Sequence, residues 1–294
     1  MALLSAPQIE EFSRDGVVLL RGVFGDWIER LRQGVDANMK NPGPWGRDYL
    51  DAAQSGRFFG DYCNWHRIEE YRQFMFESPA AEIAADLMQS DSVRIFHEHV
   101  LVKEPGTDKI TPWHHDQPYY CVDGHQVCSM WIPLDRVGIE TCPEFIAGSH
   151  DWGRWFLPRK FSGIDYDHDD EKLESMPDID NHREQYDIRS WSLQPGDAIA
   201  FHFLTIHGAP SNLSARHRRR GFAARWLGDD ARVLGAVIVP VIGNHACRTG
   251  RRRWRNRFGP VDLLVEGVRA VGMSGGSERI WAARASPGRG NRQW

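Results

Sequence analysis

The sequence predicts an α+β protein in which helices come first and a core of antiparallel strands follows. Helix signals lie within the first 90 residues, and short β-rich runs separated by turn dipeptides occupy about 93–226. Helices followed by many short strands favour an antiparallel sandwich or jelly roll. The apolar fraction of 41% is sufficient for such a core, and 294 residues allow one large domain or two ordinary ones.

Three helices are predicted near the N-terminus. Ser5 and Gln8 have the spacing of a capping box, so a short helix should begin there and end near Gly16. A second capping pattern at Asp26 precedes apolar residues at helical spacing. A third helix should cover about 80–89, directly after a Ser-Pro pair.

Strands are predicted where β-branched, aromatic and other apolar residues cluster between turn signals. The run 16–22 is apolar and bounded by glycines, and 93–103 is β-rich and contains His97 and His99 on one strand face. These two histidines either line a pocket or make core hydrogen bonds. The remaining predicted strands are 127–134, 143–147, 197–203, 204–208 and 221–226.

Two segments do not follow this strand pattern. Residues 151–189 are charged and poor in strand signals, which indicates either a solvated surface insertion or a lid over a site. Residues 231–294 form an atypical basic tail with six arginines in 248–257, which indicates a disordered end or an altered reading frame. We therefore expect a single domain over 1–230.

Composition argues against several classes of protein. The net charge of -4 gives no global reason to expect nucleic acid or anionic membrane as a partner. The N-terminus lacks a cationic start followed by an apolar run, and the longest apolar stretch is shorter than the ~20 residues that span a bilayer. Five cysteines without a CxxC pair fit a reducing, cytoplasmic location. The sequence does not indicate an oligomeric state.

The stretch TPWHHDQPYY at 111–120 is a candidate metal site. In a strand, His114 and Asp116 project to one side and His115 to the other. A His-x-Asp pair alone is weak evidence in a chain with thirteen histidines. His207, at the end of an apolar strand before a Gly-Ala-Pro break, is the best third ligand. Its competitor His202 is more typical of a buried core histidine.

Two histidines and one carboxylate on a β scaffold match the facial triad of non-haem Fe(II) oxygenases, although zinc hydrolases use similar ligands. The chemistry stays open on these residues alone. An arginine run at 216–220 follows His207 and leads into the next strand. It is either a solvated charge cluster or the source of a guanidinium that binds the remote carboxylate of 2-oxoglutarate.

Five ordered segments resemble the phytanoyl-CoA dioxygenase family of Fe(II)/2-oxoglutarate-dependent oxygenases. They lie at 5–24, 113–120, 129–135, 147–150 and 193–214, and the resemblance extends over about 5–230. It implies a double-stranded β-helix (a cupin-like jelly roll) with N-terminal and flanking helices, and iron bound by His114, Asp116 and His207. The stretch 140–145 departs from the family's Glu-Asn-Gly-x-Leu pattern, which affects the expected pocket shape and not the metal ligands.

The resemblance also implies a reaction and further site residues. Arg218 is the expected ligand of 2-oxoglutarate, with Arg219 one residue away in the same run, and Trp131 lines the co-substrate pocket. With O2 as oxidant, the expected reaction is hydroxylation of an aliphatic C–H bond of a small molecule, with release of succinate and CO2. Tyr119 and Tyr120 either face the substrate or pack in the core. The alternative is a metal-binding jelly-roll protein without oxygenase activity.

Overall fold

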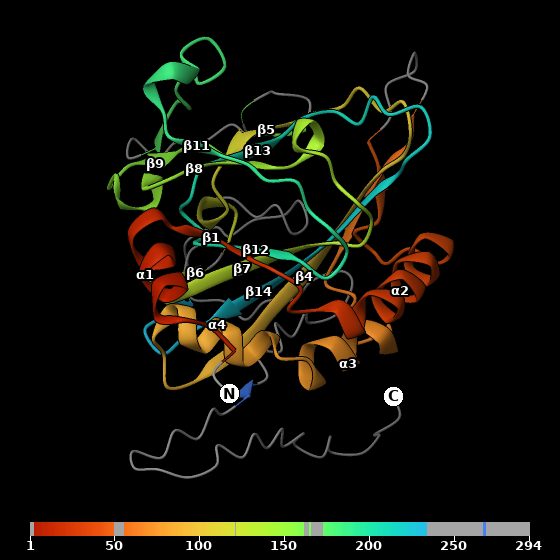
Figure 1. Ribbon diagram of the computed structural model, residues 1–294, viewed down its shortest axis with the longest axis horizontal. Helices are drawn as coiled ribbons and strands as arrows, with labels where there is room; N and C mark the ends of the chain where they lie inside the picture. Colours follow the sequence, from red (N-terminus) through yellow and green to blue (C-terminus); the bar gives the residue numbers. More distant parts are fainter. Residues whose placement is uncertain are drawn as a thin grey trace, which may run out of the picture.

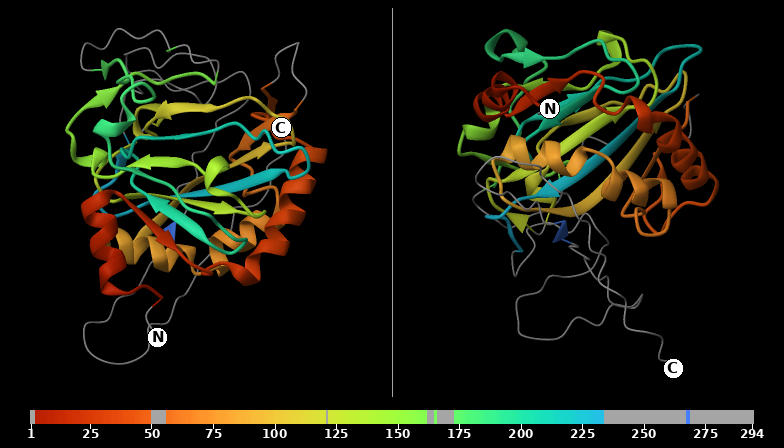
Figure 2. Two further views of the ribbon diagram at one scale, coloured as in Figure 1. Left: turned by 45° about the horizontal axis from the view of Figure 1, so that its top comes forward. Right: turned by 60° about the horizontal axis from the view of Figure 1, so that its bottom comes forward.

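Two antiparallel sheets face each other, and helices cover the outer face of the larger one (Figures 1 and 2). This computed structural model describes residues 3–49, 56–120, 122–161, 165, 173–233 and 267–268. The arrangement confirms the predicted α+β fold with a jelly-roll core. Almost all of the expected basic tail, 231–294, lies outside the described residues.

The larger sheet contains the long strands of the core. Its order is β1-β12-β7-β14-β4-β3-β2, and β16 also pairs with β4. The strands are β1 (Val17–Leu20), β2 (Arg47–Asp48), β3 (Phe58–Tyr62), β4 (Val93–Lys103), β7 (Val127–Pro133), β12 (Ala198–Phe201), β14 (Arg219–Leu227) and β16 (Gly267–Val268). The predicted strands at 93–103 and 127–134 therefore match the structure almost residue for residue.

The smaller sheet has the order β11-β8-β13-β5. Its strands are β5 (Thr111–His114), β8 (Glu144–Ile146), β11 (Ile188–Arg189) and β13 (His207–Ala209). Two short pairs lie outside both sheets, β9 (Trp155–Phe156) with β10 (Leu173–Glu174) and β6 (Val122–Asp123) with β15 (Arg232–Val233). The strand expected at 204–208 begins only at His207, because a turn in which the N–H of Thr205 bonds to the His202 carbonyl precedes it.

Four α-helices occur in the described part of the chain: α1 (Ala6–Asp15), α2 (Ile28–Lys40), α3 (Glu69–Glu77) and α4 (Ala80–Met88). Helix α1 begins as predicted, since the Gln8 side chain accepts hydrogen bonds from the Ser5 N–H and hydroxyl at 2.9 Å each. It ends at Gly16, whose φ of 69° is left-handed. The sequence prediction missed α3, because its N-cap is Ile68 and no capping side chain marks its start.

Strand alternation divides the larger sheet into a helix-facing side and a site-facing side. Phe222 of β14 packs against Tyr71 and Phe74 of α3, with ring centroids 4.9 and 5.4 Å apart. Its neighbours on the same strand, Gly221 and Ala223, point to the opposite side, toward the smaller sheet. There Gly221 lies against the indole of Trp131, and Ala223 lines the cavity described below. The largest hydrophobic cluster therefore lies between helices and sheet, and a smaller apolar cluster shares the space between the two sheets with the site.

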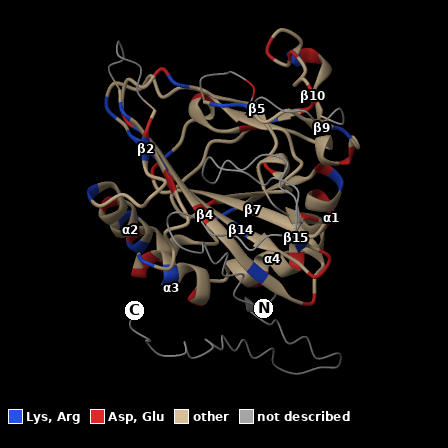
Figure 3. Cartoon of the chain, turned by 180° about the vertical axis from the view of Figure 1, so that it is seen from behind, with Lys and Arg blue, Asp and Glu red and all other residues tan. Residues whose placement is uncertain are grey.

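The surface charge is mixed. Lys and Arg lie among Asp and Glu on helices α2 and α3, as Figure 3 shows. Among the described residues, no helix has the length and apolar character that crossing a lipid bilayer requires. The expectations about nucleic acid and cytoplasmic location stay predictions.

Candidate metal centre

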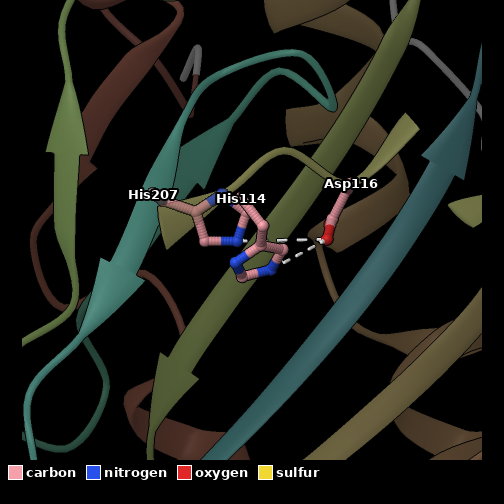
Figure 4. Close-up of side chains that lie close together, drawn as sticks. All are labelled: His114, Asp116 and His207. Carbon is pink, nitrogen blue, oxygen red and sulfur yellow. Dashed lines mark ion pairs between the residues drawn. The ribbon is translucent and has the colours of Figure 1, made fainter. Parts of the chain in front are cut away.

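The candidate metal ligands come from two paired strands of the smaller sheet. His114 ends β5, His207 begins β13, and the two are register partners. Figure 4 shows both imidazoles directed toward the carboxylate of Asp116. One ligand atom from each of the three residues lies within 4.8 Å of the others. The structure thus brings together the three residues that sequence spacing selected.

The local backbone structure that positions Asp116 differs from the one predicted. The sequence interpretation placed it on the same strand face as His114, but β5 ends at His114. The N–H of Asp116 bonds to the Phe203 carbonyl at 2.7 Å, and a short 3-10 helix, Gln117–Tyr119, follows. A turn, and not strand alternation, therefore directs the carboxylate at the histidines.

The hydrogen bonds of the two imidazoles leave the correct nitrogens for a metal. His114 Nδ1 lies 2.8 Å from the Pro112 carbonyl oxygen, and His207 Nδ1 lies 2.9 Å from that of Thr205. A carbonyl oxygen can only accept, so each Nδ1 carries the hydrogen and each Nε2 keeps a lone pair. Those Nε2 atoms lie 3.7 and 3.9 Å from Asp116 Oδ1. Two neutral imidazoles and a carboxylate make a donor set that fits a divalent transition metal.

The electrostatics of the site favour these protonation states. Burial lowers the pKa of His114, and burial together with His114 lowers the pKa of His207 to about 3. Burial alone would raise the pKa of Asp116, but Arg225 and the two histidines hold it below its ordinary value. The ligands therefore do not have to lose protons at neutral pH before a cation binds.

Arg225 is a site residue that the sequence interpretation missed. Its Nε and Nη2 lie 3.2 and 3.1 Å from Asp116 Oδ2, and both side chains are buried. The available signal was an arginine within the otherwise apolar strand GFAARW, since a charge in such a strand needs a buried partner. That partner is Asp116, the candidate carboxylate ligand.

A cavity between the two sheets adjoins the metal centre. All three candidate ligands and Arg225 line it, and most of its other wall residues are aromatic, apolar or histidine. These other residues include Tyr62, His97, His99, Leu101, Tyr119, Tyr120, Trp131, Phe145, Arg159, Phe161, Phe201, Arg219 and Ala223. The two histidines of β4 therefore face the cavity, which was one of the two possibilities for them.

The predicted 2-oxoglutarate arginines lie on opposite sides of the chain. Arg218 turns away from the cavity, with its Nη2 2.6 Å from Glu104 Oε1. Arg219 begins β14, lines the cavity and donates to the Thr141 carbonyl. Burial lowers the pKa of Arg219 to about 10, which keeps it cationic at neutral pH. In the structure Arg219, and not Arg218, therefore faces the cavity.

Trp131 occupies the place that the sequence suggested, in the cavity wall beside Phe145 and Phe201. Its indole crosses Gly221 of the neighbouring strand. A Cβ added at Gly221 would lie 2.4 Å from Trp131 Nε1, far inside contact distance. The missing side chain at Gly221 thus makes the space for the ring.

Tyr119 and Tyr120 both line the cavity but differ in their contacts. The Tyr119 hydroxyl accepts a hydrogen bond from the Arg159 N–H at 2.6 Å and donates to the Arg159 carbonyl at 2.9 Å. Arg159 and Phe161 belong to the segment 151–189, so this segment reaches the cavity. The Tyr120 ring lies 5.6 Å from the Arg225 guanidinium carbon. Whether 151–189 acts as a lid stays a prediction.

The other two histidines of the sequence argument are structural. His115 points away from the metal centre, and its Nε2 accepts the Phe156 N–H at 3.0 Å. His202 is buried between the Leu204 N–H, which donates to Nδ1 at 3.0 Å, and the His125 carbonyl, 2.9 Å from Nε2. Neither imidazole is available to the metal centre.

The sequence matches a known family. The sequence model of the family described as phytanoyl-CoA dioxygenase (PhyH) matches residues 12–221. A curated phytanoyl-CoA dioxygenase from Arabidopsis thaliana is 28% identical over 192 residues, which are 64% of this chain and 57% of the relative. The match therefore spans little more than half of that relative's length.

Solved structures share the fold at low sequence identity. The non-haem alpha-ketoglutarate-dependent carbocyclase SnoK of nogalamycin biosynthesis has a TM-score of 0.63 and 18% identity, covering 81% of this chain and 88% of its own. The epimerase SnoN, solved with Fe3+, alpha-ketoglutarate and nogalamycin RO, has a TM-score of 0.60 and 20% identity, with coverage of 85% and 96%. EctD from S. alaskensis, solved with 2-oxoglutarate and 5-hydroxyectoine, has a TM-score of 0.56 and 19% identity, with coverage of 77% of each chain.

Proposed function

The chain belongs to the phytanoyl-CoA dioxygenase family of 2-oxoglutarate-dependent oxygenases, and on that premise we propose that it hydroxylates an aliphatic C–H bond of a small molecule. Fe(II) is the proposed metal, and 2-oxoglutarate and O2 are the co-substrates, with succinate and CO2 released. One observation carries this proposal. The His114, Asp116 and His207 ligand atoms converge on a cavity that also contains a buried, cationic arginine.

The two imidazoles and the carboxylate would hold Fe(II), and the adjoining cavity would admit a co-substrate. An iron ion held there would supply the activation of O2 that C–H hydroxylation requires. The protein's task is to orient the ligands. The Pro112 and Thr205 carbonyls fix the imidazole tautomers, and Arg225 fixes the carboxylate.

Arg219 is the proposed partner of the remote carboxylate of 2-oxoglutarate. Its guanidinium is buried at the cavity wall, where a carboxylate can accept two parallel hydrogen bonds. Trp131 and Phe201 line the same cavity and exclude water from it. The proposal assigns Tyr119 and Tyr120 to the substrate side, since both line the cavity and come shortly after Asp116 in the chain. SnoN and EctD, which share the fold, were solved with alpha-ketoglutarate and 2-oxoglutarate respectively, and this supports the assignment.

Anaerobic titration with Fe(II) and 2-oxoglutarate tests the proposal without a known substrate. We expect the weak visible charge-transfer band of an iron–ketoacid chelate in the wild type, and no band in His114→Ala or Asp116→Ala. His182→Ala, which removes an exposed histidine of the 151–189 segment, is the matched control and should keep the band.

Two results would contradict the assignment. A normal band in Asp116→Ala would show that Asp116 is not a metal ligand. Uptake of metal without any 2-oxoglutarate chelate would instead favour the alternative of a metal-binding jelly-roll protein that lacks oxygenase activity.

A further inference from the structure

Three side chains that line the cavity beside the metal centre carry a buried polar atom with no hydrogen-bond partner among the described residues. These atoms are Nη1 of Arg225 and Nε2 of His97 and of His99. A buried donor or acceptor left unpaired costs roughly 1–3 kcal/mol. Three such atoms on one wall are therefore a feature that a bound molecule would explain.

Arg225 and His97 are neighbours in the cavity wall. They are direct register partners on β14 and β4, and both line the cavity. Side chains opposite each other on adjacent antiparallel strands have Cβ atoms about 5 Å apart. The ring of Tyr120 adjoins both, with centroid distances of 5.2 Å to His97 and 5.6 Å to the Arg225 guanidinium carbon.

The two side chains offer opposite hydrogen-bonding capacities. The edge of Arg225 formed by Nε and Nη2 is directed at Asp116, so Nη1 is a donor left for another acceptor. His97 Nδ1 lies 3.2 Å from the Glu98 carbonyl oxygen, so Nδ1 carries the hydrogen and Nε2 is an acceptor. Burial, and then the charge of Arg225, lower the pKa of His97, which agrees with a neutral ring.

We propose that Arg225 and His97 form a subsite that binds a hydroxyl group of the substrate next to the metal. The hydroxyl oxygen accepts from Arg225 Nη1 while its hydrogen is donated to His97 Nε2. This inference rests on the proposed function, because it places the substrate in the same cavity.

Other polar groups satisfy the pair less well. A carboxylate would accept from Arg225 but has no hydrogen for His97, and an ammonium would be repelled by the guanidinium. The surrounding walls from Tyr62, Tyr119 and Phe161 are aromatic and suit a ring skeleton. The proposed substrate class is therefore a neutral molecule that carries a hydroxyl group on an apolar skeleton.

Three small probes of similar shape test the subsite: benzyl alcohol, toluene and benzylamine. Each is titrated anaerobically into the full chain loaded with Fe(II) and 2-oxoglutarate, and its dissociation constant is read from the change in the visible band. Two hydrogen bonds to buried groups, one of them charged, should make benzyl alcohol bind about tenfold more tightly than toluene, with benzylamine weakest.

Variants identify the groups responsible. His97→Phe keeps a ring and removes the acceptor, so the preference for alcohol over toluene should fall to near unity. His97→Gln restores an acceptor and should recover part of the preference. Thr111→Val, a nearly isosteric change in the cavity wall on β5, is the control and should leave the preference intact.

The outcomes separate this inference from the proposed function. Equal binding of alcohol and toluene, or an unchanged preference in His97→Phe, would overturn the subsite even if the visible band forms normally. Failure of the band to form would overturn the proposed function. Calorimetry of the same probes with the metal-free chain would then decide the subsite by the same alcohol preference.

Discussion

Arg225 holds one carboxylate oxygen of Asp116 and leaves the other to the metal centre. Its Nε and Nη2 lie 3.2 and 3.1 Å from Oδ2, whereas Oδ1 is the oxygen closest to His114 Nε2 and His207 Nε2. Both partners of this pair are buried. The carboxylate is thereby oriented before a cation arrives, and it has one oxygen to offer.

Removal of this support should weaken metal binding although all three ligands remain. Hydrogen-bond partners of metal ligands typically contribute 10–100-fold to metal affinity. We expect Arg225→Met to raise the dissociation constant for Fe(II) by about tenfold or more, measured by anaerobic calorimetry. Arg225→Lys keeps the charge but not the planar fork, and should recover only part of the affinity.

Arg220→Met is the matched control for this experiment. It removes an arginine–aspartate pair from the same strand, in which Nη2 lies 2.8 Å from Asp135 Oδ1, away from the metal centre. It should leave the Fe(II) dissociation constant within about twofold of the wild type, as expected for a site without contact to the ligands. Equal affinity in wild type and Arg225→Met would show that Asp116 needs no second residue to orient it.

Sequence reasoning selected the candidate metal ligands more readily than the residues that support them. His114 and Asp116 are recognisable by residue type and short spacing, even though Asp116 lies beyond the end of β5, and His207 by its place at the end of an apolar strand. Arg225 needs a carboxylate 109 residues earlier in the chain, a distance in sequence that no local pattern reports.

The choice between Arg218 and Arg219 depended on strand register. A run of three arginines has no alternation of polar and apolar residues, so it gives no signal for which residue faces inward. The structure starts β14 at Arg219, opposite Lys103 of β4. Only that pairing, which is non-local, fixes the inward residue.

Arg219→Gln should mainly weaken the use of 2-oxoglutarate. A buried guanidinium–carboxylate contact that is lost costs at least about 2 kcal/mol, which corresponds to roughly a 30-fold increase in KM for 2-oxoglutarate. Arg218→Gln is the control within the same run, because its side chain bonds to Glu104 outside the cavity. Its KM should change by less than about threefold, and steady-state succinate formation measures both. A larger effect from Arg218→Gln would reverse the assignment.

Gly221→Ala should displace the Trp131 ring. The added Cβ would lie 2.4 Å from Nε1, so the indole or strand β14 has to move. Overpacking of this kind costs about 1–3 kcal/mol, and the displaced ring should also reduce binding of 2-oxoglutarate. Urea unfolding and the anaerobic chelate band measure the two effects.

Two further variants control for the Gly221 result. Gly25→Ala adds a methyl group where no atom lies within 4 Å and should leave both measurements unchanged. Trp131→Leu removes the indole whose Nε1, Cε2 and Cζ2 atoms would collide, so the double variant Gly221→Ala/Trp131→Leu should be more stable than the sum of the single effects predicts. Simple additivity would mean that Trp131 is not the obstacle.

The free energy of unfolding should fall as the pH rises toward neutrality, because Glu98 ionises at a higher pH in the folded chain than in the unfolded chain. The Glu98 side chain is fully buried on the helix-facing side of β4, where it accepts the N–H groups of Asn64 at 2.5 Å and Trp65 at 3.0 Å. Burial outweighs these bonds and raises its pKa from 4.5 to about 7. Between these two pH values the folded chain keeps a proton that the unfolded chain has released, so stability falls as pH rises through this window.

The size of the effect follows from the pKa difference. About 2.5 pH units correspond to roughly 3 kcal/mol of unfolding free energy lost by pH 7, with no further loss from this group above it. Glu98→Gln cannot ionise, so its free energy of unfolding should fall less than that of the wild type between pH 4.5 and 7.5. Urea denaturation across this range measures both proteins, and the histidine contributions common to both cancel in the difference. Parallel pH profiles would show that Glu98 is ionised in the folded protein throughout.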